Sequence, residues 1–84
     1  MRVGVQFTGT LPAGATRRWF TSKWPQAWHV VWHVAPTSPQ AGEAQVEWSV
    51  AVERASATHI TYWITIKNLT ENSVNFEARY AVLN

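Results

Sequence analysis

Apolar and polar residues alternate along much of this chain, and the alternation is clearest in its second half. Three runs, residues 45–53, 59–67 and 74–83, each have one apolar face and one largely polar face. A period of two residues is typical of strands in antiparallel sheets with one solvated side. Turn-forming residues stand between the runs, at Ala55-Ser56-Ala57 and from Asn68 to Ser73. The pattern therefore predicts three antiparallel strands here.

The first half contains three further runs whose faces are less uniform. Residues 2–8 alternate, and we expect Val3, Val5 and Phe7 to point inward. Residues 17–22 alternate without a preferred face, so either set of side chains could be buried.

Residues 27–34 allow two interpretations. As a strand they direct Trp28, Trp32 and their alternating valines inward and leave His29 and His33 outside. As a helix they place the two histidines four residues apart on one face, the spacing at which two imidazoles share a metal. The β-branched residues and the short length favour the strand.

These runs predict an all-β fold, a small antiparallel β-sandwich or jelly-roll-like domain of six to seven strands over residues 1–84. Further turns are expected at Leu11-Pro12-Ala13-Gly14, at Trp24-Pro25-Gln26 and from Pro36 to Gly42. A chain of 84 residues buries a thin core, and without cysteine it has no disulfide to stabilise it. We therefore expect it to form a homo-oligomer.

The six tryptophans are more than the core of so short a chain requires. We assign Trp28, Trp32 and Trp48 to the core. Trp63 falls on the polar face of its run, between Thr61 and Thr65, where a bare indole is unfavourable. Such a ring is typical of a ligand platform or a subunit interface. Two further tryptophans, Trp19 and Trp24, are candidates for exposure.

Several polar residues are candidates to hydrogen-bond a ligand beside Trp63. They are His29, His33, Glu47, Glu77 and Arg79. Glu47 and Glu77 would form a catalytic carboxylate pair only if their strands were neighbours. There is no serine elbow, no cysteine nucleophile and no phosphate-binding glycine loop. The sequence therefore predicts a non-enzymatic protein with no cofactor and no metal.

The net charge of +2 is small for a nucleic-acid-binding protein. Residues 17–24 do interleave three cations with three aromatic rings, which is the composition of a platform for single-stranded nucleic acid. No apolar stretch is long enough to span a membrane, and the start of the chain lacks the apolar run of a signal peptide. We expect a cytoplasmic or released protein.

Two short segments resemble small β-sandwich accessory domains of secreted bacterial enzymes. They are Gly9-Thr10-Leu11-Pro12-Ala13-Gly14 and the ending in which Asn68-Leu69-Thr70, also an N-glycosylation sequon, precedes an aromatic strand. The resemblance implies a carbohydrate-binding or structural role. Together with the aromatic residues it favours a lectin-like, carbohydrate-binding module. The alternatives are an assembly protein whose aromatics close an oligomer, and a single-stranded nucleic-acid binder acting through Arg17 to Trp24.

Overall fold

The computed structural model describes residues 1–84 and contains strands but no helix. The strands are β1 (Arg2–Leu11), β2 (Thr16–Pro25), β3 (Val30–Pro36), β4 (Val46–Glu53), β5 (His59–Asn68) and β6 (Val74–Val82). Consequently no helix is available that could cross a membrane. The all-β fold class is confirmed, with six strands.

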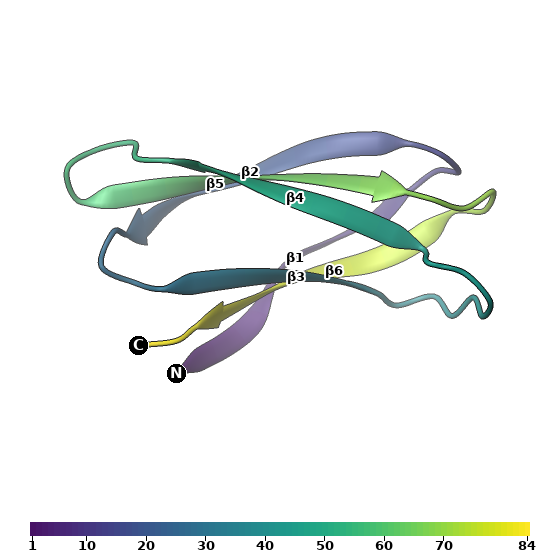
Figure 1. Ribbon diagram of the computed structural model, residues 1–84, viewed down its shortest axis with the longest axis horizontal. Helices are drawn as coiled ribbons and strands as arrows, with labels where there is room; N and C mark the ends of the chain where they lie inside the picture. The colour runs from purple at the N-terminus through teal and green to yellow at the C-terminus, as the bar shows by residue number, and fades with distance from the viewer.

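The strands form two antiparallel three-stranded sheets, seen as two layers in Figure 1. We call the sheet of order β1-β6-β3 sheet A and the sheet of order β2-β5-β4 sheet B. The hairpin between β4 and β5 is the one connection that joins neighbours within a sheet, and all others cross between the layers. As a result, the chain has four edge strands and two central strands, β5 and β6.

The two central strands follow the alternation predicted for them. In β5, Tyr62, Ile64 and Ile66 are buried, and in β6, Phe76 and Val82 are buried. A central strand has a neighbour on each side and a packed layer beneath it, so its inward side chains lose nearly all contact with water. The predicted faces of residues 59–67 and 74–83 are therefore confirmed.

Strand β1 departs from the prediction. Its register against β6 shifts between Val5 and Phe7, a β-bulge that reverses the facing of the residues before it. The side chain of Phe7 does pack on the core, but Val3 and Val5 are 71% and 49% exposed. The expectation that both valines point inward is wrong.

Two glycines occupy the inward positions of β1 and make room for large rings. A methyl group on Gly4 would stand 2.7 Å from the hydroxyl of Tyr80, and one on Gly9 would stand 2.7 Å from Cζ of Phe76. In a regular strand, residues five positions apart point to opposite faces. The bulge between Gly4 and Gly9 brings both to the inward face. At these two positions, the space on the inward side of β1 is filled by side chains of β6.

We expect Gly9→Ala to destabilise the fold by about 1–3 kcal/mol, because its methyl group must displace the buried ring of Phe76. Urea unfolding at equilibrium measures this loss. The double variant Gly9→Ala with Phe76→Leu, which removes the clashing Cζ, should lose less than the sum of the single variants. Strict additivity in that cycle would contradict the proposed contact.

Residues 27–34 do not form a helix. The strand β3 begins at Val30, and Trp28 lies in the preceding turn, where its N–H donates to the carbonyl of Pro25 at 3.1 Å. This overturns the helical alternative, in which His29 and His33 would share a metal. His33 lies within β3 and its side chain is exposed.

One end of the core is built from aromatic rings. Trp24 makes edge contacts with Trp32, Tyr62 and Tyr80, at centroid distances of 5.4, 6.3 and 5.3 Å. Burial raises the pKa of the Tyr62 phenol. Trp24 is itself buried, and its Nε1 donates to Oγ1 of Thr21 at 3.1 Å. The prediction that Trp24 is exposed is therefore wrong.

The three tryptophans that the sequence assigned to the core differ in their burial. Trp32 is buried as predicted, and Trp28 is half-buried against the core. Trp48 is 36% exposed, because the edge strand β4 has no neighbour to cover it on its outer side. Its ring contacts His33 of β3 across the open side of the sandwich, with centroids 5.5 Å apart. The assignment of Trp48 to the core is wrong.

A buried asparagine joins three segments at the opposite end of the sandwich. Asn68 is fully buried, and its Nδ2 lies 3.1, 3.1 and 2.7 Å from the carbonyl oxygens of Leu11, Pro12 and Asn72. Its Oδ1 accepts hydrogen bonds from the N–H and hydroxyl of Thr70. Nδ2 is the atom to which an N-linked glycan attaches, so the folded chain does not offer this sequon for modification.

Candidate functional site

The outer face of sheet B gathers aromatic and polar side chains in cross-strand rows. Its central strand, β5, directs Trp63 outward because Tyr62 and Ile64 point into the core. The antiparallel register places Trp63 between Phe20 of β2 and Ala51 of β4. Side chains directly opposite each other on one face are close enough to interact. The outward tryptophan therefore sits in the middle of a three-residue row.

The neighbours of Trp63 hold its ring in place from several directions. The ring of Phe20 lies 5.2 Å away, centroid to centroid, with an interplanar angle of 37°. The guanidinium carbon of Arg18 lies 4.9 Å from the indole centroid, within the range of a cation–π contact. Nε1 donates to Oε1 of Glu53 at 2.8 Å. The indole is half-buried among residues of its own chain, with its polar atom satisfied.

Phe20 is the free ring of this face. Its side chain is 62% exposed, which is uncommon for a large apolar residue. The preceding residue, Trp19, is half-buried on the other face of the strand. Trp63 supports it from the central strand, so the exposed ring is fixed in position. Across the row, Ala51 is too small to cover the indole. We call Phe20 and Trp63, with Arg18 and Glu53, the aromatic platform.

A shallow groove of about 380 Å³ adjoins the platform on the same face. Its lining comes from all three strands of sheet B: Thr16, Glu47, Trp48, Ser49, Thr65 and Lys67. Apart from Trp48, which pairs with the inward Ile66, these side chains belong to the next two rows along the strands. Lys67 pairs with Thr16 and Glu47, and Thr65 pairs with Arg18 and Ser49. Hydroxyls both donate and accept hydrogen bonds, and the two charged groups add one strong acceptor and one strong donor. The groove therefore offers hydrogen-bonding groups next to an aromatic surface.

The structure separates the residues that the sequence grouped into one site. Trp63 and Glu47 share the outer face of sheet B. Glu77, Arg79 and His33 lie on sheet A. His29 precedes β3, and its N–H donates to Oδ1 of Asn84 at 2.9 Å. Glu77 and Arg79 are thus on the opposite sheet from Trp63, and the ring of His33 contacts Trp48 rather than the platform.

The two other aromatic candidates are interior residues. Trp24 is buried, and Trp19 packs on Phe7 and Phe76 with centroids 5.6 and 5.3 Å away. Neither ring is presented to a ligand on the outer face of sheet B. Sequence reasoning therefore selected Trp19 where its neighbour Phe20 is the outward ring. In residues 17–22 either alternating set of side chains could be buried, so only the pairing of β2 with β5 decides whether Trp19 or Phe20 points outward.

The carboxylates of Glu47 and Glu77 do not form a pair. Their strands, β4 and β6, belong to different sheets. Glu77 instead forms an ion pair with Arg79, with Oε1 2.9 Å from a terminal guanidinium nitrogen and 3.0 Å from Nε. No group of three metal-ligating side chains gathers anywhere in the chain.

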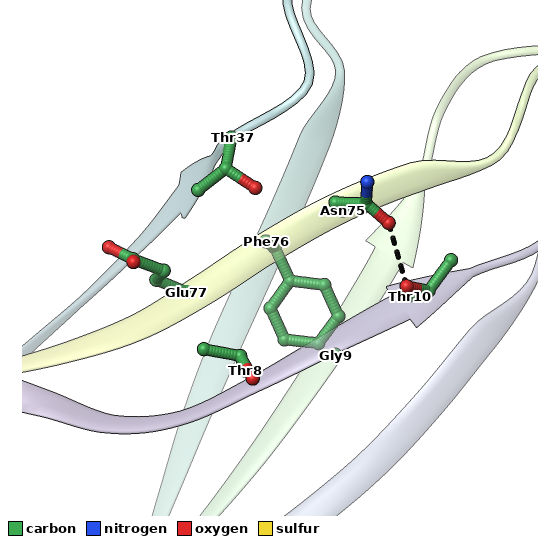
Figure 2. Close-up of a pocket in the computed structure, with 7 residues that line it drawn as sticks. All are labelled: Thr8, Gly9, Thr10, Thr37, Asn75, Phe76 and Glu77. Atoms are coloured by element: carbon green, nitrogen blue, oxygen red, sulfur yellow. Dashed lines mark hydrogen bonds between the residues drawn. The ribbon is translucent and has the colours of Figure 1, made fainter.

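A second concave region, of about 300 Å³, lies over β1 and β6 and is drawn in Figure 2. Its polar lining includes Thr8, Thr10, Thr37, Asn75 and Glu77, and the hydroxyl of Thr10 donates to Oδ1 of Asn75 at 2.7 Å. The single ring beside it, Phe76, is 1% exposed and points into the core below Gly9. This region thus has hydroxyl groups without an exposed ring. The outer face of sheet B combines both.

Comparison of the chain with protein families, curated proteins and solved structures found no match.

Proposed function

We propose that the protein is a non-catalytic binding module that binds carbohydrate on the outer face of sheet B. The observation that carries the proposal is the exposed ring of Phe20, fixed by Trp63 and adjoining a groove with hydroxyl and charged groups. The C–H face of a sugar ring packs on an aromatic ring, while its hydroxyls need donors and acceptors at the edge. A small number of polar groups beside an apolar surface gives orientation and specificity.

The groove and the platform suit an extended ligand better than a single sugar. Three successive rows, those of Lys67, Thr65 and Trp63, follow one another along β5. Outward residues of a strand are spaced about 6.8 Å apart, so the three rows cover roughly 15–20 Å. A short oligosaccharide lying along the strands would stack on Phe20 and hydrogen-bond in the groove.

The first test is glycan-array screening of the wild-type protein, followed by titration calorimetry with the best ligand. We expect Phe20→Ala to weaken binding about 10-fold, or about 1.4 kcal/mol, with little change in thermal stability because the ring is exposed. Val52→Ala, which truncates an apolar residue 63% exposed on the side of β4 away from the platform, is the matched control and should bind normally. A screen without any glycan ligand, or unchanged affinity in the Phe20 variant, would refute the proposal.

The nucleic-acid alternative involves part of the same face, because Arg18 and Phe20 both belong to it. Two carboxylates, Glu47 and Glu53, balance the cations Arg18 and Lys67 on that face, so these four groups supply no net positive charge to attract a phosphate backbone. Affinity for single-stranded nucleic acid falls steeply with salt concentration, whereas binding of a neutral glycan does not. Titrations at low and high salt therefore distinguish the two.

A further inference from the structure

The outer face of sheet A carries an apolar patch that the proposed glycan site does not use. Val3 on β1 and Val31 on β3 flank Ala81 of β6 in a single cross-strand row, and Val5 follows in the next row. Val3 and Val31 are 71% and 51% exposed, and Leu83, directly after β6, is exposed as well. The solvated face of an antiparallel sheet is normally polar, so a row of exposed valines indicates a contact surface.

We propose that this face, the valine face, joins two copies of the chain into a face-to-face dimer. Its layout is self-complementary, because a β-branched residue of similar exposure stands on each side of a small central one. A two-fold axis parallel to β6 lays β1 of one copy over β3 of the other. Val3 then packs on the partner's Val31, and Ala81 on the partner's Ala81. Aligned sheets pack in this way at a separation of about 10 Å.

The charges of the valine face are compatible with a second copy. The two-fold axis along β6 places its two charged residues, Arg79 and Glu77, over the same residues of the second copy. The ion pair within each chain offsets these like-charge contacts and leaves the face without net charge. The face therefore carries no net charge that would select an oppositely charged partner or repel an identical one. Isologous contacts of this kind are the commonest in homo-oligomers.

The size of the face is sufficient for a specific dimer. Three strands about 4.8 Å apart, with a rise of about 3.4 Å per residue from Asn75 to Leu83, cover roughly 430 Å² in projection. Packed side chains have more accessible surface than their projection, so two copies bury about 1,000 Å² or more, near the lower limit of specific interfaces. We therefore expect a dimer with a dissociation constant in the micromolar range rather than a permanent assembly.

The dimer has a consequence for binding that rests on the proposed function. Pairing through sheet A leaves both copies of sheet B on the outside of a four-layer assembly. The two aromatic platforms then face opposite directions and can bind two separate glycan chains. Because the two sites face opposite directions, the dimer does not place both on one flat surface, but it can cross-link two glycan-coated particles, which a monomer cannot do.

The test is sedimentation velocity of the wild type and of the double variant Val3→Glu with Val31→Glu over a range of concentrations. We expect the wild-type mass to rise from 9.5 kDa to twice that value with concentration, and the double variant to remain at 9.5 kDa. Val52→Glu is the matched control, since Val52 is 63% exposed on sheet B, and it should dimerise normally. Circular dichroism should show the same melting temperature for all three proteins within a few degrees.

Three results would overturn the dimer: a wild-type protein that stays at 9.5 kDa up to about 1 mM, a double variant that still dimerises, or a control that dissociates. The mass measurement contains no glycan, so it is independent of the proposed function. If the double variant is monomeric and binds soluble glycan as the wild type does but no longer cross-links glycan-coated beads, both proposals stand. If no glycan binds and the masses behave as expected, only the function fails.

Discussion

Replacing Asn68 by aspartate is expected to destabilise the protein by about 3 kcal/mol or more at neutral pH. The substitution keeps the oxygen that accepts hydrogen bonds from Thr70, and it turns the donating nitrogen into an oxygen facing three carbonyl groups. Asn68 is fully buried, so no water relieves the repulsion. For a chain of 84 residues the loss corresponds to a fall in melting temperature of about 15 °C, measurable by circular dichroism.

The pH dependence of Asn68→Asp makes this prediction sharper. Burial beside carbonyl oxygens raises the folded-state pKa of the introduced carboxyl above its unfolded value of about 3.9. A raised pKa means that the stability contributed by the bound proton is present below pH 4 and is lost as the pH rises through the folded-state pKa. The variant should therefore lie closest to the wild type in acid.

Asn68→Ala is the control for that pH dependence. It removes the same hydrogen bonds without adding a titrating group, so its loss relative to the wild type should not change between pH 4 and pH 7. If the aspartate variant melts like the wild type at pH 7, Asn68 does not have the buried environment described above.

The parts of the fold that the sequence predicted are those where local pattern and tertiary environment agree. Central strands β5 and β6 have a packed layer on one side and solvent on the other, so their burial follows the simple alternation of their residues. The turns fell where Pro, Gly, Asn and Ser cluster, because those residues adopt turn geometry with little strain. Gly14, at a positive φ of 67°, is one example.

The errors lie on edge strands, where the environment depends on the pairing of distant residues. The bulge in β1 turns Val3 and Val5 outward, and an extra residue of this kind leaves no mark in a period-two pattern. A second irregularity in β2, between Thr21 and Trp24, brings Trp24 into the core. The side chain of Trp48 points to the predicted face, yet β4 is an edge strand and has no outer neighbour to cover the ring. In all three places, the side chain's burial is decided by the neighbouring strand.

The candidate site was predicted only in part for the same reason. The outward position of Trp63 followed from its own strand. The identity of its partner, Phe20, followed from the register between β2 and β5, which no local pattern contains. The placement of Glu47 and Glu77 on different sheets followed from the topology. Sequence therefore found the central ring of the platform, and the structure supplies the exposed ring beside it.

The buried position of Trp24 and the exposed position of Phe20 can be tested by measuring how much each truncation destabilises the protein. The sequence suggested that Trp24 is exposed; the structure makes it the centre of the aromatic cluster, in contact with Trp28, Trp32 and both tyrosines. We expect Trp24→Ala to cost about 3–5 kcal/mol, because it leaves a cavity among rings that are held by strands of both sheets. Truncating the exposed Phe20 should cost less than about 1 kcal/mol.

Urea unfolding followed by far-ultraviolet circular dichroism measures both losses without relying on tryptophan emission, which the Trp24 substitution itself changes. A loss of 3–5 kcal/mol is a large share of the total stability of a domain this size, about 4–13 kcal/mol, so a fraction of Trp24→Ala could unfold without urea. Trp24→Phe keeps an aromatic ring and loses the hydrogen bond to Thr21, and it should lie between the wild type and Trp24→Ala, at about 1–2 kcal/mol. If Trp24→Ala were as mild as Phe20→Ala, Trp24 would be a surface ring, and the core would have to be organised around Trp32 and the tyrosines alone.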